Sequence, residues 1–160
     1  MKFIKQLFLV LGLTFLTSCG FSPMLKNPKI DNIKINKIEY SGDKDLVFFL
    51  RNSLNLKTNN NIKDGYILEI KITESIASSK KNSAGVTISE NITITINLNI
   101  YDASNNLINN DIISETRLID VTNNIISDNE TRRVERSNLI SFLIQELKFS
   151  IKSKIIQNLK

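Results

Sequence analysis

Segment 86–100 alternates apolar and polar side chains more regularly than any other part of the 160-residue chain. Thr, Ser or Asn stands at nearly every odd position. Because successive side chains of a β-strand point to opposite faces, the alternation predicts a long strand with one buried face. A helix with these residues would be apolar on all sides, which disfavours it. The apolar residues at the even positions are Val86, Ile88, Ile92, Ile94, Ile96, Leu98 and Ile100.

Three further segments have strand patterns. In 33–40 the alternation slips by one residue, which indicates a bulge at Asn36 or Lys37. A second strand is expected over 66–72, extending as far as Ile76, and another within 107–121. The polar stretches Ala77–Gly85 and Asp102–Asn106 are expected to be a loop and a turn.

Two segments show helical spacing instead. Residues 43–56 begin with capping residues and acids, which predicts a short amphipathic helix starting near Asp43. The polar segment Asn123–Thr131 is expected to be a loop, followed by a long helix to the end of the chain. The apolar stripe of the first helix contains Leu46, Phe49, Leu50 and Leu54, and that of the second contains Val134, Ile140, Leu143, Ile144, Leu147, Ile151, Ile155 and Leu159.

The order strand, helix, three strands, helix defines the expected fold. Consecutive strands joined by short turns form a mostly antiparallel sheet, and amphipathic helices can cover its apolar face. We therefore predict an α+β two-layer sandwich over residues 32–160, with a four-stranded sheet covered on one face by two helices.

The first 18 residues have the pattern of a signal peptide. Lys2 and Lys5 precede an apolar run, Leu7–Leu16, which is too short to span a bilayer comfortably and ends in small polar residues. Residues 1–18 are therefore expected to be removed. The run closes with Leu-Thr-Ser-Cys, which fits the lipobox of bacterial lipoproteins, in which the cysteine thiol is acylated.

Cys19 is the only cysteine of the chain. A structural or disulfide cysteine is the alternative, but the chain has no second thiol, and a free thiol is a liability in an oxidising compartment. We therefore predict lipidation at Cys19, with segment 19–31 as a linker between the membrane and the domain. Each buried acyl CH₂ contributes about 0.8 kcal/mol, so two or three chains anchor a protein stably without spanning the bilayer.

The composition argues against catalysis. The chain has no histidine, and its one thiol is expected to be acylated, which removes the usual nucleophiles and bases. Asp43 and Asp45 are explained by the preference of helix N-termini for acids. The net charge of +5 is spread among interspersed acids and lysines and does not indicate nucleic acid binding. We expect a binding or scaffolding protein with no cofactor beyond the covalent lipid.

Sequence features along most of the mature chain resemble the lipopolysaccharide-assembly lipoprotein LptE family, in its alphaproteobacterial form. They are CGFSPML at the lipobox, YILEIKITESIASSKKNSAG, ENITITINLNIYD, and SDNETRRVERSNLI before the last helix. The resemblance implies a lipoprotein on the periplasmic side of the outer membrane that partners the LptD β-barrel in lipopolysaccharide delivery. Gly20 is consistent, because lipoproteins retained in the inner membrane commonly have Asp after the cysteine.

The resemblance also implies basic residues that contact lipopolysaccharide phosphates. Lys80 and Lys81 stand at the first such place, and their ammonium groups suit phosphate as point charges. At the second place the chain has Ser127, with no basic residue before Arg132. Two other functions stay open: a non-catalytic envelope-tethering lipoprotein that does not bind lipopolysaccharide, and a small-ligand carrier, although few aromatic residues are present to line a pocket.

Overall fold

The computed structural model of the chain describes residues 33–59 and 64–158. The predicted signal peptide, Cys19 and the predicted linker lie outside the described residues. The described elements are β1 (Ile35–Gly42), α2 (Lys44–Leu54), β2 (Tyr66–Lys81), β3 (Thr87–Tyr101), β4 (Leu107–Asp120) and α3 (Ile125–Asn158).

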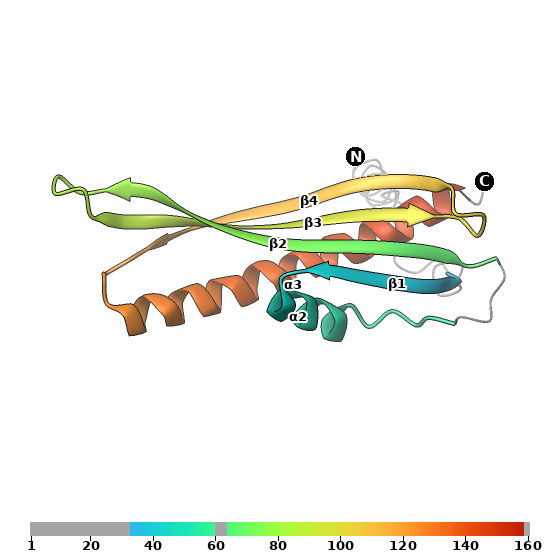
Figure 1. Cartoon of the computed structure of the whole chain (residues 1–160), viewed down its shortest axis with the longest axis horizontal. Coiled ribbons are helices and arrows are strands. Elements are labelled where there is room, and N and C mark those ends of the chain that lie inside the picture. The colour runs from blue at the N-terminus through green and yellow to red at the C-terminus, as the bar shows by residue number, and fades with distance from the viewer. Residues whose placement is uncertain (1–32, 60–63, 159–160) are drawn as a thin grey trace, which may run out of the picture. The chain divides into compact units, whose positions relative to one another are not determined.

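The four strands form one open sheet in the order β1-β2-β3-β4 (Figure 1). β1 runs parallel to β2, and the other neighbouring strands are antiparallel. The register shifts between Ile35 and Lys37, which confirms the predicted bulge. The predicted α+β fold with a mostly antiparallel sheet is also confirmed.

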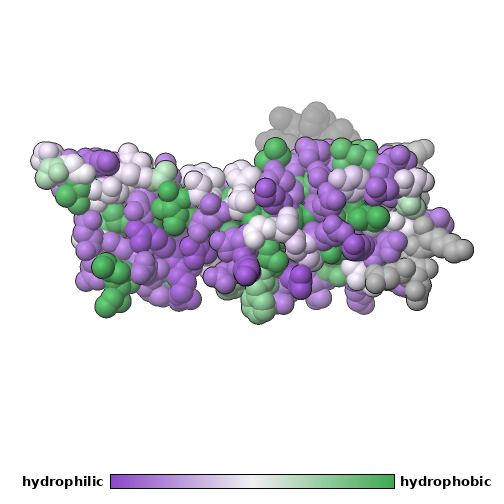
Figure 2. Space-filling view, in the orientation of Figure 1, coloured by the Kyte–Doolittle hydropathy of each residue, from purple (hydrophilic) through white to green (hydrophobic). Residues whose placement is uncertain are grey.

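The core lies between one face of the sheet and the two helices (Figure 1). Ile96 and its even-numbered neighbours on β3 are fully buried, as the alternation predicts. On the opposite face, hydroxyl groups bond across the strands: Thr93 Oγ1 lies 2.8 Å from Thr116 Oγ1, and Thr95 Oγ1 lies 2.9 Å from Ser114 Oγ. The sheet therefore has one apolar covered face and one largely polar open face, on which Ile112 and Leu118 of β4 are exposed. Figure 2 shows that, on the side it displays, exposed apolar residues (green) are scattered among polar ones (purple).

Helix α2 begins as expected. Asp43 is its N-cap, and the Asp43 carboxylate accepts a hydrogen bond of 3.0 Å from the backbone N–H of Asp45. Leu46, Leu50 and Leu54 are buried. Phe49 differs from the predicted stripe because it is 50% exposed.

Gly42 marks the place where the chain leaves the sheet for α2. Its φ of +114° is unfavourable for other residues, and a Cβ there would lie 1.9 Å from the Ile72 carbonyl oxygen. The backbone N–H of Asp43 donates to the same oxygen at 3.2 Å. Beyond Ile72, β2 pairs only with β3 among the described residues.

The predicted loop Ala77–Gly85 is wrong over its first part. β2 continues to Lys81, because backbone pairing with β3 extends the strand although residues 77–81 have no large apolar side chain. The actual turn spans 82–86, where Asn82 Oδ1 accepts from the backbone N–H groups of Ala84 and Val86.

The predicted loop Asn123–Thr131 is also wrong. α3 begins at Ile125, because Asn124 Oδ1 accepts hydrogen bonds from the N–H groups of Ile126 and Ser127 and so caps the helix. Val134 is 42% exposed and does not belong to the buried stripe. The stripe starts instead at Leu139, and the predicted stripe residue Leu159 lies outside the described residues. Among the described helices, none is long and apolar enough to cross a membrane.

Candidate functional site

The candidate site lies where β2 and β3 approach their shared turn, near the start of α3. Lys80 pairs with Ser89, and Lys81 pairs with Thr87. The register shifts on either side of Lys80, so the two lysines occupy an irregular end of the strand. They lie on β2 and not in the loop predicted for them.

Both lysine side chains are exposed, and neither forms an ion pair with a carboxylate of residues 33–59 or 64–158. Two lysines that are adjacent in sequence therefore have exposed side chains and no carboxylate partner among the described residues. Their ammonium groups attract anions as point charges. An edge strand also uses lysine to discourage pairing with other chains, which is the structural alternative for the same residues.

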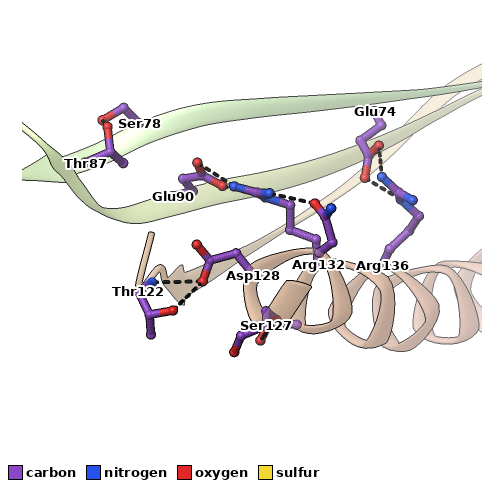
Figure 3. Close-up of polar contacts among 11 residues, drawn as sticks. Glu74, Ser78, Thr87, Glu90, Thr122, Ser127, Asp128, Arg132 and Arg136 are labelled. Atoms are coloured by element: carbon purple, nitrogen blue, oxygen red, sulfur yellow. Dashed lines mark hydrogen bonds and ion pairs between the residues drawn. The ribbon is translucent and has the colours of Figure 1, made fainter. Parts of the chain in front are cut away.

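Two arginine–glutamate pairs connect α3 to the sheet near this end (Figure 3). Arg136 donates to both carboxylate oxygens of Glu74 at 2.7 Å. Arg132 donates to the two oxygens of Glu90 at 2.8 and 3.0 Å. Such two-point contacts fix orientation as well as charge, so they hold the first half of α3 in one register against the sheet.

Asp128 is buried at the start of α3, next to the last turn of chain before the helix (Figure 3). Its Oδ1 accepts a 2.8 Å hydrogen bond from the Thr122 N–H and a 2.9 Å bond from the Thr122 hydroxyl. These bonds lower the pKa of the Asp128 carboxyl, and the bond from the Thr122 backbone has the largest effect. The carboxylate therefore stays charged at neutral pH and joins the end of β4 to α3.

The second predicted phosphate contact has no unpaired cation. Arg132 is bonded to Glu90 and also donates to Asn129 at 3.1 Å. Arg133 is paired with Glu130 at 2.6 Å. Ser127 lies in the first turn of α3, and its N–H is occupied by the cap. Among the described residues at this end, Lys80 and Lys81 are the only basic residues that have no carboxylate partner.

The sequence interpretation missed the part that Glu74 and Glu90 play. Both continue the even-numbered, inward-facing series of their strands, since Glu74 pairs with Ile94 and Glu90 pairs with Ile119. Arg132 and Arg136 are four residues apart, which places them on one side of a helix. The sequence does contain a signal for this interface. It consists of acids at inward-facing strand positions together with two arginines four residues apart on a helix.

The fold is one found among solved bacterial lipoproteins. The sequence matches no protein-family model and no curated protein. The crystal structure of rare lipoprotein B from Shewanella oneidensis matches with a TM-score of 0.63 and 11% identity, covering 78% of this chain and 100% of that chain.

Two further structures show the same likeness. The minor lipoprotein from Acinetobacter baumannii matches with a TM-score of 0.56 and 16% identity, covering 76% of this chain and 93% of that one. Lipoprotein B from Nitrosomonas europaea matches with a TM-score of 0.60 and 9% identity, covering 79% and 88%. At these identities the likeness shows a shared fold.

Proposed function

We propose that this chain is a lipid-anchored envelope protein without catalytic activity that acts as an LptE-like partner of an outer-membrane β-barrel in lipopolysaccharide assembly. The observation that carries the proposal is the fold, which bacterial lipoproteins share over 88% to 100% of their own chains in the three comparisons above. The lipobox at Cys19, with Gly20 and Phe21 after it, supports lipid attachment and the outer membrane as the location.

In this proposal Lys80 and Lys81 contact lipid phosphates. Their support is charge without a carboxylate partner, at an exposed and irregular strand end. The polar open face of the sheet supports a protein partner, because its cross-strand hydroxyl pairs offer donors and acceptors at regular spacing. An envelope-tethering lipoprotein would have the same anchor and fold, without the lipid contact and without the barrel.

The first test is recovery of the barrel. When the full chain is purified from outer membranes in mild detergent, we expect a large β-barrel protein to co-purify in a fixed ratio. The measurement is the mass and the heat-modifiable gel mobility of the co-purified band. Purification of the chain alone, under conditions that keep other outer-membrane complexes intact, would favour the tethering function.

The second test concerns the two lysines. The double variant Lys80→Glu/Lys81→Glu should bind lipopolysaccharide about tenfold or more weakly, since charge-assisted contacts are lost and repulsion is added. Its melting temperature should stay nearly unchanged, because exposed charges contribute little to stability. Binding by the parent should also fall as salt rises, since screening shortens the Debye length to about 8 Å at physiological ionic strength.

The double variant Lys44→Glu/Lys57→Glu is the matched control. It makes the same change in net charge at two other exposed lysines without a described carboxylate partner. We expect it to bind lipopolysaccharide like the parent, and both double variants to retain the barrel. Equal binding by all three proteins at low salt would remove Lys80 and Lys81 from the lipid contact and leave the assembly function to be carried by other residues.

A further inference from the structure

Strand β1 forms one edge of the sheet, and within residues 33–59 and 64–158 its outer side is mostly unpaired. At its first residue, Ile35 forms an isolated bridge with Thr58, and the Asn59 N–H donates to the Ile35 carbonyl at 2.9 Å. From residue 37 to residue 42, no other described strand pairs with this side. Unpaired backbone groups on an edge strand can accept an additional strand from another chain.

A groove runs beside this edge. It lies between β1, the end of α2 and segment 55–58, and its volume is about 400 Å³, within the range of ligand sites. Ile38, Tyr40, Arg51 and Leu56 contribute to its walls. The unpaired edge of β1 can therefore pair with a backbone, and the groove beside it can select the side chains of the added strand. Strand-addition sites have this arrangement.

Arg51 gives the groove its charge. Its guanidinium lies 5.2 Å from the centroid of the Tyr40 ring, a cation–π distance that positions it without neutralising it. Arg51 forms no ion pair with a carboxylate in the described part of the chain. Desolvation of the Tyr40 ring raises the pKa of its hydroxyl, so the hydroxyl is protonated at neutral pH and can donate a hydrogen bond.

Most charged residues near the groove are basic. Lys34 and Lys57 are close in sequence to the bridge that joins Ile35 to Thr58. The acidic residue on β1 is Glu39, and it is bonded to Lys37. A segment that enters this groove therefore meets an excess of positive charge, which favours an acidic partner.

We propose that the outer edge of β1 binds an extended acidic segment of a partner protein by strand addition. The backbone of that segment pairs with residues 37–42, and a carboxylate of the segment forms a two-point contact with Arg51. The carboxylate is a Glu or Asp side chain, because Arg51 lies beside Tyr40, inside the paired range 37–42, where a chain terminus would end the pairing. This interaction is independent of the lipopolysaccharide contact and the barrel proposed above.

The test uses the full chain in detergent and short fluorescent peptides of alternating Val and Thr. One peptide has a central Glu and an amidated end, a second has a central Gln and a free carboxylate end, and a third has neither carboxylate. Fluorescence anisotropy measures affinity, and backbone amide shifts locate the bound peptide. We expect the Glu peptide to bind at least about tenfold more tightly than the third, with shifts confined to 37–42 and Arg51. Tighter binding of the free-end peptide than of the Glu peptide would overturn the proposal.

Arg51→Gln should weaken that binding about tenfold, whereas Lys44→Gln on the same helix should leave it unchanged, with melting temperatures of both variants close to the parent. A peptide methylated at alternate backbone nitrogens, which cannot pair with a strand, should not bind. Equal binding by the methylated peptide, complete competition by acetate alone, shifts on another strand, or no preference for the Glu peptide would each overturn the proposal.

Discussion

Replacing Ile96 with alanine is expected to lower the free energy of unfolding by about 2–5 kcal/mol, the range for truncating a large buried aliphatic side chain. Ile96 is fully buried near the middle of β3 and pairs with Ile72 on one side and Ile113 on the other. The cavity left by the substitution would lie between the sheet and the helices, where neighbouring side chains are already packed. Urea denaturation monitored by circular dichroism measures this change in the free energy of unfolding.

Thr95→Ala is the matched control on the opposite face of the same strand. Thr95 loses only a hydrogen bond to Ser114 that lies on the exposed face, so the expected cost is about 1 kcal/mol or less. A cost for Thr95→Ala equal to that for Ile96→Ala would contradict a sheet that is covered on one face and would indicate that the threonine face is buried in the folded protein.

Cys19→Ala is expected to abolish fatty-acid incorporation completely, because no second thiol exists in the chain. The variant should keep its signal peptide, and the lipid-anchored mature form should not be produced, since lipobox processing requires the acylated cysteine. Its domain should fold as the parent does, because the described core residues begin at Ile33 and the preceding linker is expected to add nothing to them. Labelling with a fatty-acid analogue, together with the intact mass of the protein, measures both effects.

Ser18→Ala is the control for that experiment, because it keeps a small residue at the lipobox position before the cysteine. Ser18→Ala should be labelled and processed like the parent. Continued labelling of Cys19→Ala would show that the lipid is attached elsewhere, and the lipobox interpretation of residues 16–19 would then be wrong.

Segments whose apolar side chains fill the core were predicted well from the sequence. The even-numbered series of β3 predicted both the strand and the face that is buried, because burial on one side imposes a period of two. Asp43 also predicted the start of α2. A capping carboxylate accepts hydrogen bonds from N–H groups that the first turn of a helix leaves unpaired.

Segments stabilised mainly by backbone or polar contacts were not predicted. The end of β2, residues 77–81, has no large apolar side chain, and its strand conformation depends on pairing with β3. The first turns of α3 are stabilised by Asn124, Asp128 and the arginine pairs rather than by an apolar stripe. The parallel pairing of β1 with β2 also requires the tertiary structure, because alternation is the same in either direction.

The departure of β1 at Gly42 has a consequence for the kinetics of local opening. Beyond Ile72, β2 has a strand neighbour on one side only within the described chain, and it contributes no buried apolar side chain there. Amide hydrogens of β2 after Ile72 should therefore exchange with solvent through small fluctuations, whereas those opposite Leu98 should exchange only when the whole domain unfolds. Lys80 and Lys81 thus belong to a segment that can change conformation around a bound molecule without disturbing the core.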